Sequence, residues 1–201
     1  MKKGDDIIKK ENNSTGESRF YEKLALTIKS ISLQSKRDIG KILILGDNLH
    51  SIYISMKKIF PNAYYVMTNN SEKFLKQLEE DFDRKTSIKI RQLDIFSGSS
   101  LTDFYLEFGK FDLILLSGIF DDYDMSNRKK KNSIIFLHKN FLNLNGLFGI
   151  LNGEEVLTQD LLSLLKKIRS FKKVIKTHQK KNMHPKYLIF TKKNRIKLFG
   201  D

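Results

Sequence analysis

Residues that could bind a ligand or take part in catalysis follow four short apolar or alternating runs of the sequence. In chain order these are Ile42–Leu45 with Gly46, Asp47 and Asn48; Ala63–Met67 with Thr68 and Asn69; Ile88–Leu93 with Asp94 and Ile95; and Phe111–Leu116 with Ser117. Runs of this length and composition are typical of strands. In an open α/β sheet, ligands bind beyond the carboxyl ends of the strands. We therefore expect function in the segments after these four strands.

The first two strand ends lie where a nucleotide-type cofactor would bind but keep little of the usual sequence pattern. Gly46 lets the backbone come close to a ligand, and Asn48 tolerates the left-handed conformation that such a turn often needs. Cofactor-binding sheets commonly place an acid after the second strand for the ribose hydroxyls, where this sequence offers only Thr68 or Asn69. Structural alternatives remain for both ends: one glycine in a tight turn, and a turn at Asn69 with Asn70 as a helix N-cap.

The other two strand ends carry carboxylates. Asp94 could accept a hydrogen bond from an exocyclic amine while Ile95 packs against a flat ring, or it could form only a turn. The segment after the fourth strand contains Asp121, Asp122, Tyr123 and Asp124. This acidic and aromatic group could bind a cationic amine through charge and cation–π contact, or it could be a solvated loop.

Helices and strands must alternate to position these residues. Apolar periodicity predicts a helix over Phe20–Leu33. The further expected helices are 51–60, 71–82, 133–142 and 156–169, and the further expected strands are 147–151, 173–177 and 186–191. This order predicts an α/β, Rossmann-like, doubly wound and mostly parallel seven-stranded sheet, with an antiparallel final strand and helices on both faces. We expect residues 1–18 to be a flexible polar arm, 19–195 a single domain and 196–201 a tail.

The positive charge of the chain lies in its last third. Of the net +14, residues 1–127 contribute nothing, since 19 Lys/Arg balance 19 Asp/Glu, whereas residues 128–201 hold 18 Lys/Arg against 4 Asp/Glu. A basic region of this size attracts polyanions such as nucleic acid. The excess is mostly Lys rather than Arg, however, and a Lys-rich composition without a ligand explains it equally well. The densest cluster, 128–131, is expected in a loop before a helix.

Composition excludes several classes of protein. The chain has no cysteine, and its four histidines lack paired metal-ligand spacing, so we expect neither disulfides nor a metal site. It has no apolar stretch of the roughly 20 residues that a membrane helix needs, and its first residues are charged where a signal peptide is apolar. These features predict a cytoplasmic protein with no membrane partner.

The sequence resembles the spermidine synthase-like family, the polyamine aminopropyltransferases, within the class I S-adenosylmethionine-dependent methyltransferase fold. The resemblance runs from about Phe20 to Lys192 and rests on the order and spacing of several weak motifs. These are Phe20-Tyr21-Glu22-Lys23-Leu24-Ala25, similar to Tyr-His-Glu-x-Leu-Ala; Ile42 to Gly46, similar to Val-Leu-Ile-Ile-Gly; Leu93-Asp94-Ile95-Phe96, similar to Gly-Asp-Ala-Phe; Phe111 to Asp121, similar to Tyr-Asp-Val-Ile-Ile-x-Asp-x-x-Asp; Leu144 to Phe148, similar to Leu-x-Pro-Gly-Gly; and Phe171 to Val174, similar to Phe-x-x-Val.

The resemblance implies a ligand, a reaction and a set of roles. The cofactor would be S-adenosylmethionine or its decarboxylated form, held by Gly46, Asp47, Asn48, Thr68, Asn69, Asp94 and Ile95. A small amine would meet Tyr21, Asp122, Tyr123 and Asp124, and the protein would be a homodimer.

The family's catalytic base, however, is replaced by Ser117, which leaves Asp121 or Asp122 as the substitute. The resemblance therefore implies a transferase with a degraded or repurposed site. A nucleic-acid methyltransferase that uses the basic last third and a non-catalytic binding module are the alternatives.

Overall fold

The computed structural model describes residues 3–82, 88–119, 126–151, 171–176 and 187–192. Their strands form one sheet in the order β3-β2-β1-β4-β5-β7-β6. The strands are β1 Lys41–Gly46, β2 Tyr64–Asn69, β3 Ile88–Gln92, β4 Phe111–Ser117, β5 Leu142–Leu151, β6 Phe171–Lys176 and β7 Tyr187–Lys192. Neighbours from β3 to β5 pair in parallel, whereas β7 is antiparallel to both β5 and β6.

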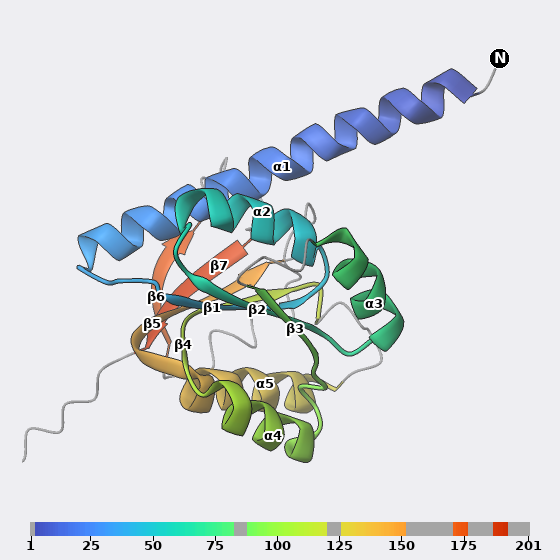
Figure 1. Ribbon diagram of the computed structural model, residues 1–201. Coiled ribbons are helices and arrows are strands. Elements are labelled where there is room, and N and C mark those ends of the chain that lie inside the picture. The colour runs from blue at the N-terminus through green and yellow to red at the C-terminus, as the bar shows by residue number, and fades with distance from the viewer. Residues whose placement is uncertain (1–2, 83–87, 120–125, 152–170, 177–186, 193–201) are drawn as a thin grey trace, which may run out of the picture.

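Helices cover both faces of the sheet (Figure 1). One layer contains α1 Lys3–Gln34, α2 Leu49–Ile59 and α3 Glu72–Asp81, and the other contains α4 Gly98–Phe108 and α5 Asn127–Phe136. Alternation along the strands sends side chains to the two layers in turn. On β1, Ile42 and Ile44 pack in the core beneath α1 and α2, whereas Leu43 and Leu45 pack in the core beneath α4 and α5. The prediction of an α/β, Rossmann-like sheet is confirmed.

Strand order reverses between β1 and β4. The chain moves outward from β1 to β2 and β3, then returns to place β4 on the other side of β1. The carboxyl ends of β1 and β4 therefore border a crevice, which is the usual place for a ligand in this architecture. The register pairs Gly46 with Ser117 at this point.

Asp112, the one charged residue within the apolar run of β4, joins three strands. Its Oδ2 accepts hydrogen bonds from the backbone N–H groups of Gly40 (3.1 Å) and Lys41 (2.9 Å), and its Oδ1 accepts one from Asn143 Nδ2 (2.7 Å). These bonds lie near the starts of β1 and β4, at the opposite end from the crevice. The hydrogen bonds to β1 and β5 thus account for a charged residue within the apolar run of β4.

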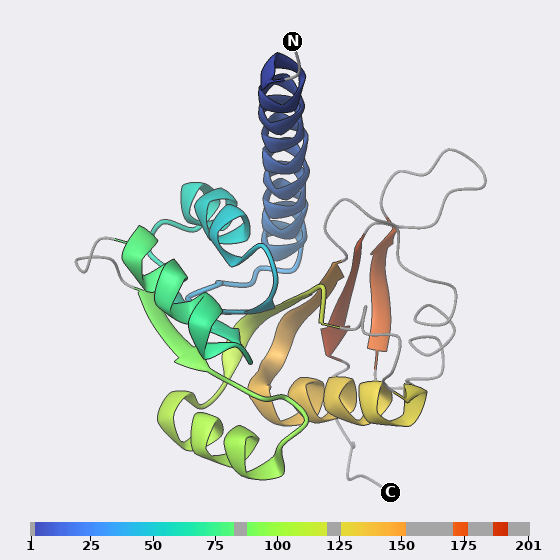
Figure 2. The same ribbon diagram turned by 90° about the vertical axis from the view of Figure 1, so that its right-hand side faces the viewer.

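The first helix is longer than the apolar periodicity predicts. Residues 3–18, expected to be a flexible polar arm, form the first half of α1, which extends well beyond the sheet (Figures 1 and 2). The segment has no proline and contains several Lys and Glu residues, which favour helix. Once the second half of α1 packs on the sheet, adding residues to an existing helix costs far less than starting one. The domain limits at 19, 195 and 196 remain predictions.

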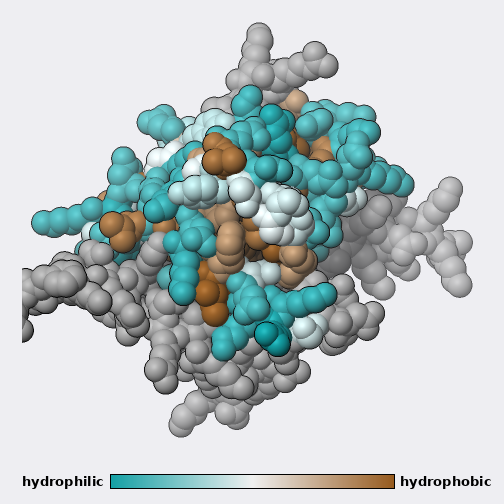
Figure 3. Space-filling view, turned by 90° about the horizontal axis from the view of Figure 1, so that it is seen from below, coloured by the Kyte–Doolittle hydropathy of each residue, from teal (hydrophilic) through white to brown (hydrophobic). Residues whose placement is uncertain are grey.

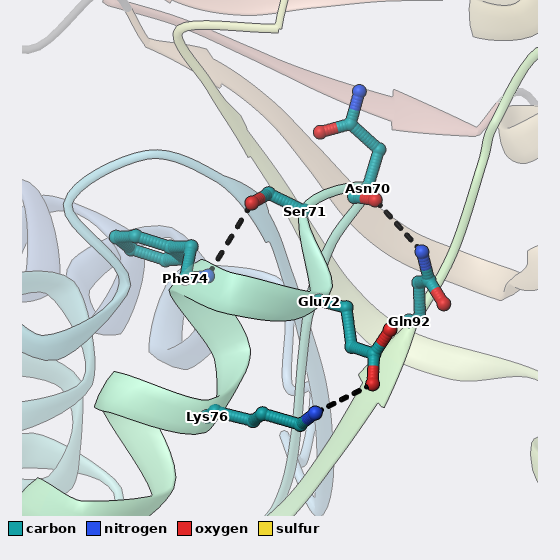
Figure 4. A network of polar contacts seen from close by, with 6 residues as sticks. All are labelled: Asn70, Ser71, Glu72, Phe74, Lys76 and Gln92. Atoms are coloured by element: carbon teal, nitrogen blue, oxygen red, sulfur yellow. Dashed lines mark hydrogen bonds and ion pairs between the residues drawn. The ribbon is translucent and has the colours of Figure 1, made fainter.

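Three further differences concern one unexpected helix and the ends of two expected helices. Helix α4 has no counterpart among the expected elements. The N-cap of α3 is Ser71 rather than Asn70: Ser71 Oγ accepts a hydrogen bond from the Phe74 N–H at 3.3 Å, whereas the Asn70 carbonyl accepts one from Gln92 Nε2 at 2.9 Å (Figure 4). The expected helix over 133–142 begins earlier, at Asn127, and ends in a π-helical turn over Leu137–Phe141. The basic cluster 128–131 consequently lies in a helix and not in a loop.

The surface over α4 and α5 is mixed in character. Figure 3 shows this face, on which apolar side chains lie in several patches among hydrophilic ones. The large exposed apolar side chains of these two helices are Tyr105, Leu106 and Phe136. Among the described helices, none combines the length and apolar content needed to cross a membrane. The expected helix over 156–169 lies outside the described residues.

Candidate functional site

A cleft of about 230 Å³ lies at the carboxyl ends of the central strands. It is placed where the strand order reverses, as the architecture predicts. Six residues expected at the site line this cleft: Gly46, Asp47, Thr68, Asn69, Asp94 and Ile95. The other lining residues are Leu45, Asn70, Leu93, Phe96, Gly118 and Ile119.

Gly46 brings β1 close to β4. Its φ is 102°, and a Cβ there would overlap the Ser117 carbonyl oxygen and lie 2.6 Å from Ile119 Cγ1. The Asp47 N–H donates a hydrogen bond to the same carbonyl at 2.9 Å. Asn48 has a φ of 56°, which confirms the left-handed conformation expected of this residue. Asn48 is not among the residues that line the cleft. This turn requires glycine for structural reasons alone.

Gly118 makes room for the carboxylate of Asp47. Its φ is 68°, and a Cβ at this position would overlap Asp47 Oδ2 and lie 3.1 Å from Asp47 Cγ. The Asp47 carboxylate therefore lies directly against the backbone after β4. Within the described part of the chain it makes no hydrogen bond or ion pair, and partial burial raises its pKa. An acid in this position would gain from a cationic partner.

Thr68 offers a buried hydroxyl at the cleft. The residue is 1% exposed, and its Oγ1 has no hydrogen-bond partner among the described residues. Buried hydroxyls are normally hydrogen-bonded, and leaving one unpaired costs about 1–3 kcal/mol. Because Thr68 also lines the cleft, a bound ligand is a natural partner for this group.

Asn69 connects the ends of β1 and β2. Its Nδ2 donates a hydrogen bond to the Gly46 carbonyl at 2.9 Å, and its Oδ1 accepts one from the Ser71 N–H at 2.8 Å. Both groups of the side chain are therefore engaged in positioning the turn before α3. This agrees with the structural alternative for Asn69, while the residue still borders the cleft.

Asp94 and its neighbours form the end of the cleft after β3. Asp94 is exposed, and its Oδ1 accepts a hydrogen bond from the Phe96 N–H at 2.8 Å. Its other carboxylate oxygen makes no hydrogen bond within the described chain. Ile95 is 5% exposed, whereas the ring of Phe96 is 37% exposed at the cleft. The turn alternative for Asp94 is thus correct for one oxygen, and the second oxygen is left for a ligand.

Ser117 and Tyr21, like Asn48, are expected site residues that do not line the cleft. Ser117 is fully buried, and its Oγ has no partner among the described residues, but it is not part of the cleft lining. Alternation along β4 places its side chain on the same face as Leu115, towards α1 and α2. Tyr21 is fully buried in α1 with its ring against Phe20. Residues 121–124 lie outside the described residues.

The sequence reasoning did not assign roles to Gly118, Ile119 or Phe96. Gly118 carried a usable signal, since a glycine directly after a buried strand is typical of a site that needs close backbone approach. Its contact with Asp47 is a tertiary one and has no trace in the local sequence. No group of three or more His, Asp or Glu residues within the described chain is placed to hold a metal ion.

Comparison of the sequence with models of protein families and with curated proteins finds no match. Solved structures do resemble the chain. The plantazolicin methyltransferase BpumL in complex with S-adenosylhomocysteine has a TM-score of 0.62 and 16% identity over 96% of this chain and 92% of that one. The CurJ carbon methyltransferase has a TM-score of 0.56 and 13% identity over 78% of this chain. A predicted O-methyltransferase from Agrobacterium tumefaciens has a TM-score of 0.54 and 10% identity, covering 77% of this chain and 74% of that one.

These likenesses identify the fold. The chain has the Rossmann-like fold of class I S-adenosylmethionine-dependent methyltransferases, and it spans about half, 49%, of the CurJ chain. The narrower resemblance to the spermidine synthase-like family remains a prediction, as do the homodimer and the nucleic-acid partner.

Proposed function

We propose that this chain binds S-adenosylmethionine in the cleft and transfers a group from it to an acceptor. The observation that carries the proposal is the buried hydroxyl of Thr68, a residue of the cleft lining, which has no hydrogen-bond partner among the described residues. In addition, the two turns at Gly46 and Gly118 leave no room for a Cβ atom. Backbone close to a ligand and a buried polar group awaiting a partner are features of a binding site rather than of a filled core.

The order of the strands assigns a part of the ligand to each strand end. Asp94, Ile95 and Phe96 after β3 would hold the adenine, with the free oxygen of Asp94 accepting from the exocyclic amine. Thr68, near the end of β2, would hydrogen-bond the ribose. Gly46, the last residue of β1, would lie against the sulfur-containing substituent of the ribose.

The cleft is slightly smaller than the roughly 300 Å³ at which ligand pockets usually begin, so it fits the nucleoside better than the whole ligand. The remainder of the ligand would extend beyond the described lining of the cleft.

When bound, S-adenosylmethionine supplies an activated carbon attached to a positively charged sulfur. This chain's residues would orient that carbon and exclude water from it. The apolar side chains of Leu45, Leu93 and Ile119 around the polar groups suit this task. Proton removal from an acceptor cannot be assigned to Ser117, since its hydroxyl is buried outside the cleft.

Aminopropyl transfer from decarboxylated S-adenosylmethionine is the second candidate. One structural observation favours it besides the family resemblance: the described residues that line the cleft include two carboxylates and no Lys, Arg or His. A ligand with two positive charges and no carboxylate suits such a lining. This reaction would need a base, and Asp121 would have to provide it in place of Ser117.

Isothermal titration calorimetry tests the proposal. We expect binding of S-adenosylmethionine, and Asp94→Asn should weaken it about tenfold or more, because a charge-assisted hydrogen bond is worth roughly 1.5–3 kcal/mol. The substitution keeps an oxygen for the Phe96 N–H, so the turn should survive. Asp103→Asn, on the exposed side of α4, is the matched control and should bind like the unaltered protein.

Two outcomes would redirect the proposal. If neither S-adenosylmethionine nor its decarboxylated form gives heat at 100 µM protein, the binding function is refuted. If both bind and incubation with amines yields no methylthioadenosine, aminopropyl transfer is refuted for those acceptors.

A further inference from the structure

Two ionisable residues of the described lining, Asp94 and Asp47, lie at opposite ends of the cleft. Asp94 follows β3 and Asp47 follows β1, with β2 between them. Neighbouring strands are about 4.8 Å apart, so the ends of β3 and β1 are separated by about 10 Å. A nucleoside that meets Asp94 with its base therefore presents the substituent on its ribose to Asp47.

Asp47 is an exposed residue of the cleft lining that has no charged partner among the described residues. Gly118 leaves space for its carboxylate, which lies against the backbone after β4. Within the described chain it forms neither a hydrogen bond nor an ion pair, and partial burial raises its pKa. A carboxylate kept in such a place is stabilised when a cation binds beside it.

We propose that Asp47 makes the cleft select the positively charged sulfonium of S-adenosylmethionine over the neutral thioether of S-adenosylhomocysteine. The inference rests on the proposed function and goes beyond it, since it assigns the discrimination between substrate and product to one residue. The two molecules share the base, the ribose and the amino-acid end. Only the sulfur, which is charged in one and neutral in the other, distinguishes them, together with the transferred methyl group.

The charge balance of the lining gives the expected size of the effect. Among the residues that the structure describes, the cleft lining offers no Lys, Arg or His to offset Asp47. The attraction between a unit positive charge and a partly solvated carboxylate lies between its value in bulk water and its value at a protein surface. This attraction corresponds to a preference of about tenfold for the charged ligand over the neutral one. Decarboxylated S-adenosylmethionine, with one negative charge fewer, should bind at least as tightly as S-adenosylmethionine. Release of the neutral product would then be easier than release of the substrate.

The experiment is calorimetric titration of the full chain and its Asp47→Asn variant with the same three ligands. The unaltered protein should bind S-adenosylmethionine about tenfold more tightly than S-adenosylhomocysteine. In Asp47→Asn this ratio should fall below twofold, mainly through weaker binding of the charged ligand. Circular dichroism would establish that the variant is folded.

Two controls separate charge from other causes. Sinefungin carries an ammonium group on a carbon in place of the sulfonium, and it should follow S-adenosylmethionine in both proteins if charge decides the preference. Asp94→Asn should weaken all the ligands by a similar factor and leave their ratios unchanged.

Equal affinities for substrate and product in the unaltered protein would overturn the inference, and so would an unchanged ratio in Asp47→Asn. Neither result would affect the proposed function, which fails if neither S-adenosylmethionine nor its decarboxylated form binds.

Discussion

Substitution of Gly46 by alanine tests whether the turn after β1 has the geometry described above. The residue has a φ of 102°, and an added Cβ would overlap the Ser117 carbonyl oxygen and approach Ile119 Cγ1 at 2.6 Å. The first contact is with backbone that is itself bonded to the Asp47 N–H. Relief therefore requires the ends of β1 and β4 to move apart.

The cost follows from two contributions. An L-residue in a sparsely populated backbone region costs about 1–3 kcal/mol. Forcing atoms into packed surroundings costs about 1–3 kcal/mol more. We expect Gly46→Ala to lower the free energy of unfolding by about 3 kcal/mol or more. With a urea m-value of about 2 kcal/mol/M, the midpoint of unfolding should fall by about 1.5 M.

Urea denaturation followed by circular dichroism measures this change. Gly98→Ala is the matched control, because Gly98 begins α4 and a Cβ there meets nothing within 4 Å. Alanine at that position should be neutral or stabilise the protein by up to about 1 kcal/mol. A loss below 1 kcal/mol in Gly46→Ala, with the control unchanged, would refute the described approach of β1 to β4.

Three other substitutions test the burial and the pairing of individual side chains. Asp47→Asn should raise the free energy of unfolding at pH 7 by less than about 1 kcal/mol, since the carboxylate is partly solvated. Because folding raises the pKa of this acid, the gain should shrink as pH falls through the raised pKa towards the ordinary value of 3.8 and should be lost below it. Urea midpoints at several pH values would measure it, and a gain that grows at low pH would contradict it. Thr68→Val should stabilise the free protein by about 1 kcal/mol and weaken nucleoside binding in calorimetry, whereas loss of stability would mean that the hydroxyl is already paired. Phe104→Ala should cost about 3–5 kcal/mol in urea denaturation because Phe104 is 4% exposed among aromatic rings, whereas Leu106→Ala, at 78% exposure, should stay within about 0.5 kcal/mol; similar losses for both would contradict the described packing of α4.

The strands of the sheet could be predicted because their signal is local. Runs such as Phe111–Leu116 are apolar on both faces, and only burial between two helical layers accommodates such a pattern. Helix α4 carried a local signal too: Ser97 at the N-cap, apolar Leu101, Phe104 and Phe108 at helical spacing, and Gly109 at the end. The existence of α4 is therefore predictable from the sequence alone.

The limits of the sequence are clearer at the site. The residue types at the strand ends identify six of the twelve residues that line the cleft. They do not indicate that Ser117 points away from it, because one residue more or less at the end of β4 would reverse the face. Nor do they indicate that Gly118 lies against Asp47, since that contact joins segments distant in the chain and depends on how β1 and β4 pair.

A crystal structure of the protein grown with S-adenosylmethionine tests the central claim most directly. The account predicts density for the nucleoside in the cleft, with the adenine amine within hydrogen-bond distance of Asp94, the ribose at Thr68 and the sulfur nearest Asp47. Density for the nucleoside elsewhere on the molecule would contradict the account. A cleft that holds only solvent at millimolar ligand would contradict it as well.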